Sequence, residues 1–112
     1  MLENSSGTVI FTGATSAVRG SADGLAFGAA KFAVRGMAES TARDLGPDGI
    51  HVSHVIIDGM IDMPTVRENF PDMDDEELLD PDAIANSYWH LVEQDRSSWT
   101  LELDVRPYLE EF

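Results

Sequence analysis

The sequence predicts an α/β fold in the form of a parallel β-α-β-α-β layer. Two apolar runs, GTVIFTG at 7–13 and IHVSHVII at 50–57, are rich in β-branched residues and have the length of buried strands in a parallel sheet. Between them, residues 25–45 place apolar side chains at helical spacing. Two strands joined by one helix form a right-handed βαβ unit with parallel strands.

Turn-forming and capping residues define the ends of the predicted helix at 25–45. Ser21 or Asp23 is expected to cap its start, and Gly46-Pro47 ends it. Its apolar stripe consists of Phe27, Ala30, Val34, Met37, Ala38, Thr41 and Leu45. The preceding loop over 13–24 is long for a strand-to-helix connection, and such loops are usually functional.

The rest of the chain supplies a second helix and a third strand. Asp58-Gly59 ends the second strand in a turn, and Asp80-Pro81 provides an N-cap and a first-turn proline for the last helix. Tyr88, Trp89 and Trp99 are expected to pack that helix onto the last strand. The remaining elements are an acidic loop over 63–80 with at most a short helix, a helix over 81–94 and a half-buried edge strand over 100–105.

The predicted sheet has few strands for the number of apolar residues that its strands contain. The 112 residues suffice for one small domain, and three strands with two helices leave the outer edge of strand 7–13 without a neighbour. That strand is as apolar as a central strand. The pattern therefore indicates half of a larger sheet.

The net negative charge disfavours two classes of binding partner. Twenty-one acidic residues face seven basic ones, for a formal charge of −14, which repels nucleic acid and anionic membrane surfaces. The acidic residues are spread along the chain, which favours adaptation to high salt (a halophilic protein) over recognition of a basic partner. No signal peptide is visible, so we expect a cytoplasmic protein.

No metal site is expected. The chain has no cysteine, so disulfides and thiolate zinc sites are excluded. His51 and His54 are three residues apart on a strand and point to opposite faces of the sheet. The acidic run that begins at Asp72 has Glu77 where a calcium-binding EF-hand loop requires glycine.

Three segments together resemble the C-terminal half of a short-chain dehydrogenase/reductase. They are GTVIFTGATSAVRG at 7–20, AFGAAKFAVRG…GPDGIHVSHVIIDGMIDMP at 26–64, and LDPDAIANSYWHLVEQDRSSWTLELDVRP at 79–107. The resemblance implies the C-terminal half of a doubly wound, Rossmann-like sheet. It also implies an oxidoreductase that uses NAD or NADP on a carbonyl/alcohol pair. The family's glycine-rich dinucleotide loop is absent from this chain, so Met1 is expected to be an internal methionine.

The resemblance places a divergent catalytic centre in the predicted helix. The family motif Y-x-x-x-K matches Phe27 and Lys31, the only lysine in the chain, so the lysine that holds the nicotinamide ribose is kept and the tyrosine that transfers a proton is lost. The family's serine position falls on Ala14, and Thr15 or Ser16 could supply a hydroxyl in its place. Phe27 is interpreted as a core or pocket-lining aromatic residue.

Residues after the second strand complete the candidate site. Asp58 ends a parallel strand, where ligands bind in such sheets. One hypothesis is that Asp58 replaces the tyrosine as proton donor, with its pKa raised by apolar surroundings; the alternative is a turn-forming aspartate. The resemblance further assigns Gly59, Ile61 and Thr65 to the cofactor site, although Met63 occupies the family's threonine position.

A second class of function stays open. The family helix that matches 25–45 commonly packs against its counterpart in a dimer, so we expect a homo-oligomer through this helix. A non-catalytic, self-associating α/β module would also cover an exposed sheet edge. Binding of NAD or NADP separates the two hypotheses.

Overall fold

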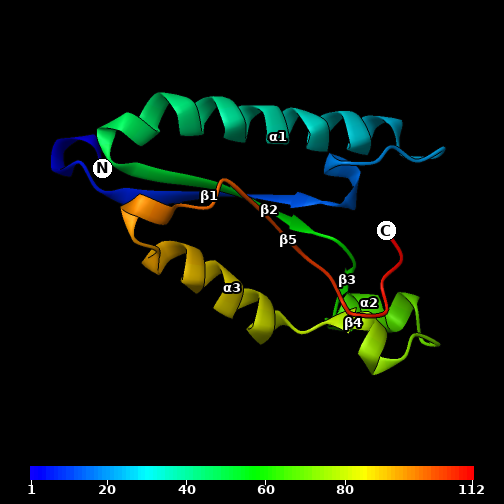
Figure 1. Ribbon diagram of the computed structural model, residues 1–112. Helices are drawn as coiled ribbons and strands as arrows, with labels where there is room; N and C mark the ends of the chain where they lie inside the picture. The colour runs from blue at the N-terminus through cyan, green and yellow to red at the C-terminus, as the bar shows by residue number, and fades with distance from the viewer.

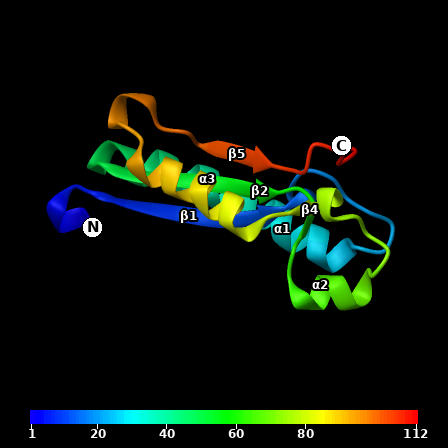
Figure 2. The same ribbon diagram turned by 90° about the horizontal axis from the view of Figure 1, so that it is seen from below.

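A three-stranded parallel sheet with a helix on each face forms the body of the molecule (Figure 1). The computed structural model describes all residues, Met1–Phe112. The main elements are β1 (Gly7–Ala14), α1 (Leu25–Leu45), β2 (Ile50–Ile57), α3 (Pro81–Glu93) and β5 (Glu102–Val105). The strand order is β1-β2-β5, and Figure 2 shows β1 and β5 on either side of β2. The predicted α/β class with parallel strands is therefore confirmed.

The acidic segment is more ordered than its composition predicts. It contains a short helix, α2 (Pro64–Asn69), and a two-stranded parallel pair formed by β3 (Met60–Ile61) and β4 (Leu78–Leu79). Arg67 ties the segment together, because its guanidinium binds Asp62 at 2.8 Å and also Asp75. Each strand of the β3–β4 pair has only two residues and therefore leaves no period in the sequence.

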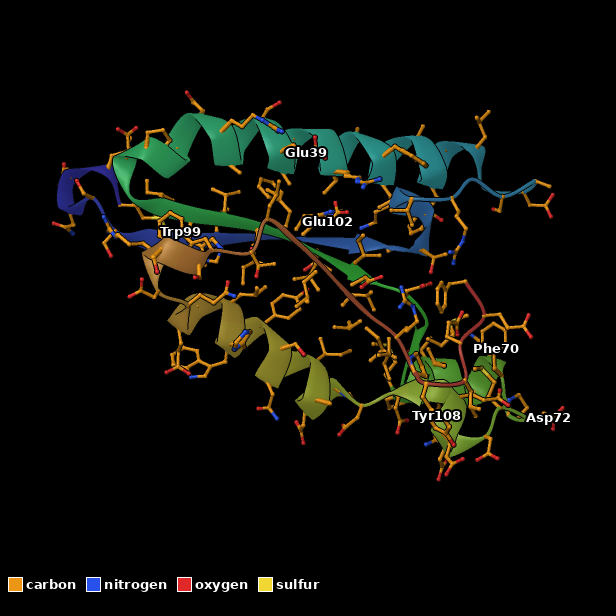
Figure 3. All side chains as sticks on the ribbon, viewed as in Figure 1. Glu39, Phe70, Asp72, Trp99, Glu102 and Tyr108 are labelled. Atoms are coloured by element: carbon orange, nitrogen blue, oxygen red, sulfur yellow. The ribbon has the colours of Figure 1, made fainter.

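The core lies between β2 and α3. Every residue of β2 is buried, as expected for a central strand with a helix on each face. Val55, Ile57, Leu79 and Leu91 form the hydrophobic cluster, with Leu103 and Val105 of β5 packed against it. On the α1 side, the buried apolar residues Ile50, Val52 and Ile56 of β2 lie beside a polar group, in which Glu102 accepts hydrogen bonds from Arg35 of α1 (Figure 3).

The predicted inward face of α1 is partly wrong. Phe27 and Met37 are more than half exposed, whereas Gly28 and Ala38 are the buried residues of the helix. Small side chains let the helix approach the sheet closely, and His54 and Glu102 lie beneath it beside buried apolar residues of β2. Apolar residues on both faces of α1 made the choice of face ambiguous.

The predicted cap of α1 is also wrong. The N-cap residue is Gly24, and no side chain hydrogen-bonds to the first turn. A turn closed by the hydrogen bond from Gly24 N–H to Ser21 O brings the Ser21 hydroxyl beside the Cα of Gly24. The hydroxyl is therefore directed away from the free N–H groups of the helix.

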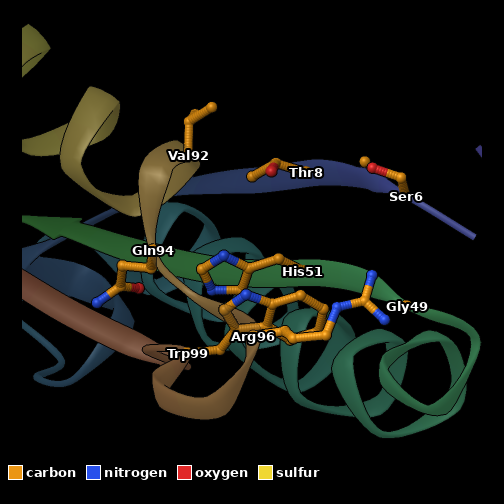
Figure 4. Close-up of a pocket in the computed structure, with 9 residues that line it drawn as sticks. Ser6, Thr8, Gly49, His51, Val92, Gln94, Arg96 and Trp99 are labelled. Atoms are coloured by element: carbon orange, nitrogen blue, oxygen red, sulfur yellow. The ribbon is translucent and has the colours of Figure 1, made fainter.

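The aromatic residues of the last helix and strand do not form the expected cluster. Trp99 stacks on His51 of β2 with 4.8 Å between ring centroids, Tyr88 binds the Thr12 hydroxyl on β1 at 2.6 Å, and Trp89 is exposed. The Trp99 and His51 rings line a hollow of about 540 Å³ together with Arg96 (Figure 4). This hollow lies at the amino ends of the strands.

A side-chain clamp sets the boundary between α3 and β5. The Gln94 amide donates to Thr100 Oγ1 at 2.8 Å and accepts from the Thr100 backbone N–H at 3.0 Å. The clamp closes the turn between the two elements. As a result α3 ends at Glu93 and β5 begins at Glu102, two residues later than predicted.

The outer edge of β1 has no strand beside it, because β1 pairs only with β2. Next to this edge, Ile10 and the α3 side chains Ile84, Tyr88 and Trp89 line an apolar groove of about 430 Å³. Open ladder groups beside an apolar groove are the features expected at the junction with a further part of a sheet. None of the helices has the length and apolar character needed to cross a lipid bilayer.

Candidate functional site

Polar side chains gather where the three main strands end. Thr15 follows β1, Asp58 follows β2 and Arg106 follows β5, and all three meet at the carboxyl edge of the sheet. In open α/β sheets this edge is where ligands bind. The parallel pairing of Ala14 with Ile57 and of Ile57 with Val105 places the three strand ends at one level.

Asp58 is the centre of this cluster and is 2% exposed. Its Oδ1 accepts hydrogen bonds from the Thr15 hydroxyl at 2.6 Å and from Arg19 Nη2 at 3.3 Å, and its Oδ2 accepts from Arg106 Nε at 3.2 Å. Three donors therefore satisfy both carboxylate oxygens. A buried carboxylate is stable in its charged form only when it is paired in this way.

The hypothesis that apolar surroundings raise the pKa of Asp58 is wrong. Burial alone would raise this pKa, but the hydrogen bonds from Thr15 and Arg106 and the positive charges of Arg19 and Arg106 outweigh burial and lower it. Asp58 is therefore ionised at neutral pH and has no proton to donate. Its geometry fits a residue that positions the side chains around it.

The hydroxyl candidates after β1 have different positions. Thr15 and Ser16 lie in the single 3-10 turn Thr15–Ala17, and the preceding Ala14 is the last residue of β1. The Thr15 hydroxyl donates its proton to Asp58, so it is oriented by the carboxylate. Ser16 is half-buried in the same turn.

Lys31 reaches the carboxyl end of β1 from α1. Its Nζ donates to the Thr12 backbone oxygen at 3.4 Å and lies 5.7 Å from the centroid of the Phe27 ring. Phe27 is 55% exposed, so its interpretation as a core residue is wrong. Phe27 and Lys31 are thus neighbours one turn apart on the helix, as their spacing predicts.

Gly59, Ile61 and Thr65 occupy the segment that leaves β2. Gly59 has φ +148°, and a Cβ at this position would lie 2.9 Å from Pro107 Cδ, so only glycine fits without strain. Ile61 is half-buried in β3, and Thr65 is exposed in α2. No hydrogen bond joins these three residues to Asp58 or Lys31.

Two site residues were missed by the sequence interpretation, Arg19 and Arg106. Arg106 follows the last strand just as Asp58 follows the second, so strand order alone could have placed it at this edge. Arg19 lies in the loop between β1 and α1 and gave no comparable signal. The His, Asp and Glu side chains form no group of three that could hold a metal ion.

Comparisons with known proteins bear on the family and the fold of the chain. Residues 1–74 match the family model described as short chain dehydrogenase. A short-chain dehydrogenase from Rhodopseudomonas palustris is 42% identical, with 96% of this chain and 42% of that chain covered and a TM-score of 0.74. A comparison with curated proteins finds no significant match.

Two more distant solved structures share the fold. The closed form of a serine dehydrogenase complexed with NADP⁺ is 18% identical, with 100% of this chain and 48% of that chain covered and a TM-score of 0.84. An NADPH-bound short-chain oxidoreductase from Pseudomonas aeruginosa PAO1, described as containing an atypical catalytic center, is 18% identical, with 94% and 46% covered and a TM-score of 0.76.

The chain spans less than half the length of these three solved structures. With the family match over residues 1–74 and the parallel sheet in place, the chain belongs to the short-chain dehydrogenase family.

Proposed function

We propose that this chain forms the substrate-binding and nicotinamide-binding half of an NAD- or NADP-dependent oxidoreductase that acts on a carbonyl/alcohol pair. The observation that carries the proposal is the position of Lys31, whose ammonium group lies at the carboxyl end of β1 beside an exposed Phe27. Membership of the short-chain dehydrogenase family supports the same reaction class.

The residues of this chain fit one end of the cofactor. Lys31 presents its ammonium group where it could hold the nicotinamide ribose, and the Ile61 backbone with Gly59 and Thr65 could border the nicotinamide. The phosphate groups would need a glycine-rich loop, and the 112 residues contain no G-x-G-x-x-G sequence. A bound nicotinamide cofactor would supply the hydride.

The side chains around the site have different roles in the proposed reaction. Phe27 offers an apolar surface and transfers no proton. Asp58 is ionised and holds the Thr15 hydroxyl and the Arg19 guanidinium in fixed orientations. Ser16, which no carboxylate binds, is the hydroxyl left to exchange a proton with the substrate oxygen.

The length of the native protein tests the proposal first. We expect intact-mass spectrometry of the protein from its source cells to give about twice the 12.3 kDa of this chain, because the matched structures are about twice as long. In that native-length protein, Lys31→Met is expected to weaken NADPH binding about tenfold, the value of one charge-assisted hydrogen bond lost.

Arg43→Met is the matched control for Lys31→Met, because Arg43 is an exposed cation near the other end of α1 that pairs with Glu39. NADPH binding is measured by fluorescence titration, and the control variant should bind as the unchanged protein does. Equal affinity of the Lys31→Met variant and the control would contradict the role assigned to Lys31.

A second candidate function is self-association through α1. Leu25 and Phe32, two turns apart, lie on the same side of this helix and are both exposed, an apolar surface that a contact with another chain would cover. We propose that a second copy of the chain packs against this face, in an enzyme or in a non-catalytic module.

Light scattering during gel filtration tests the contact. Phe32→Glu is expected to convert a dimer into a monomer, because a carboxylate in the contact loses its hydration without a partner. Phe70→Glu, at a residue with the same 45% exposure near α2, should leave the dimer intact. A monomeric unchanged chain, or equal effects of the two variants, would exclude this contact.

A further inference from the structure

We propose that Arg19 binds an anionic group of the substrate, and that the substrate is therefore a carboxylate-bearing carbonyl or hydroxy compound. This inference rests on the proposed oxidoreductase function and names the substrate class of the same site. Its basis is the arrangement of charges around Asp58.

The protein holds the Arg19 guanidinium in place but leaves most of its N–H donors without a partner. Its guanidinium makes one hydrogen bond, from Nη2 to Asp58 Oδ1 at 3.3 Å, whereas a guanidinium carries five N–H donors. The side chain is 42% exposed at the carboxyl edge of the sheet. An arginine anchored at one nitrogen with further donors towards solvent is suited to bind a second anion, and carboxylates fit its planar donor pairs.

Three other arginines pair with carboxylates that no second arginine contacts. Arg35 binds Glu102 through two hydrogen bonds, Arg43 pairs with Glu39, and Arg67 pairs with Asp62 and Asp75. Arg19 instead shares Asp58 with Arg106, which binds Asp104 as well. In a chain with twenty-one acidic residues, a shared carboxylate at the ligand-binding edge stands out from this pattern.

The carboxylates around Arg19 are matched by cations. Asp58, Asp104 and Glu110, whose Oε2 lies beside Gly59, are balanced by Arg19, Arg106 and Lys31 at the end of β1. Asp58 is buried beneath the guanidinium groups and its oxygens are already occupied. A substrate carboxylate would therefore meet Arg19 from the solvent side, with the charge of Asp58 offset by Arg106.

Binding of small probes tests the inference without any cofactor. The chain of 112 residues, labelled with ¹⁵N, is titrated with pyruvate and, separately, with methyl pyruvate, and the arginine side-chain N–H signals are followed by NMR. We expect pyruvate to shift the Arg19 signal in a saturable manner and the neutral ester to leave it unchanged. Arg19→Gln should weaken pyruvate binding about tenfold, which corresponds to ~1.4 kcal/mol.

Two further variants make the result specific. Arg19→Lys keeps the charge and should bind pyruvate more tightly than Arg19→Gln but less tightly than the unchanged chain, because lysine cannot make the paired contact. Arg43→Gln should bind as the unchanged chain does. Equal affinities for pyruvate and its methyl ester, no saturable shift with pyruvate, or full binding by Arg19→Gln would overturn the inference. Because no arm uses NADPH, these failures would leave the proposed oxidoreductase function standing.

Discussion

Replacing Asp58 by alanine is expected to lower the free energy of unfolding by about 2–3 kcal/mol. The substitution removes a buried carboxylate that three donors contact, and it leaves Arg19, Arg106 and the Thr15 hydroxyl facing a cavity without their partner. Loss of one member of a buried ion pair costs about 3–5 kcal/mol. The lower value is expected here because both arginines are partly exposed and can regain water.

Asp104→Ala is the matched control for Asp58→Ala. Asp104 binds the same Arg106 guanidinium, but its side chain is 48% exposed. An exposed ion pair contributes ~1 kcal/mol or less. Urea unfolding of the two variants should therefore differ by at least ~1 kcal/mol. Equal losses of unfolding free energy in the two variants would show that the burial of Asp58 does not determine how much the cluster stabilises the fold.

The pH dependence of stability tests the charge of Asp58 directly. Because its pKa is lower in the folded chain than in the unfolded chain, the ionised carboxylate stabilises the fold above the unfolded pKa of about 4. That contribution is lost as the pH falls through the folded pKa. The difference in unfolding free energy between the unchanged chain and Asp58→Asn should thus be largest near pH 6 and shrink below about pH 4. A difference that grows in acid would mean that Asp58 is protonated in the fold.

The elements that follow one period could be predicted from the sequence. β1, β2 and α1 have unbroken patterns of apolar residues, and their predicted bounds differ from the structure by at most one residue. The small β3–β4 pair could not be predicted, because two-residue strands have no period. The inward face of α1 was ambiguous, since the helix carries apolar residues on both faces and meets polar as well as apolar side chains of the sheet.

Part of the candidate site could likewise be predicted from the sequence, and part of it could not. The position of Asp58 at a strand end followed from the order of strand and turn, and the order of elements brings it beside Thr15. The direction of its pKa shift did not follow, because the two cations that lower it are 39 and 48 residues away along the chain. Contacts at that separation are fixed by the folded sheet and are not visible in local patterns.

A second large loss of stability is expected at Gly13, where alanine should cost about 2–3 kcal/mol. A Cβ on Gly13 would overlap Nε2 of His54, the side chain that fills the space between β1 and α1. His54 is 1% exposed, and its Nδ1 lies 3.1 Å from Glu102 Oε2. Glu102 in turn receives two hydrogen bonds of 2.9 Å from Arg35, which hold the carboxylate that the ring contacts. Overpacking a site of this kind costs about 1–3 kcal/mol.

Urea unfolding of a double-mutant cycle separates this clash from other effects of the substitution. In a His54→Ala background the three atoms nearest to the Cβ are removed, so Gly13→Ala should cost less than ~0.5 kcal/mol there, a coupling of about 2 kcal/mol between the two positions. Gly36→Ala in α1 is the control, since a Cβ added at Gly36 would have no atom within 4 Å. Alanine at position 36 should stabilise the chain by about 0.5–1 kcal/mol, because glycine is the weaker helix former. If Gly13→Ala lowers the free energy of unfolding equally in the presence and absence of the His54 ring, the strain lies in the β1 backbone and not in a clash with His54. In that case the contact with the group of His54, Glu102 and Arg35 would not be what requires glycine at position 13, near the carboxyl end of β1.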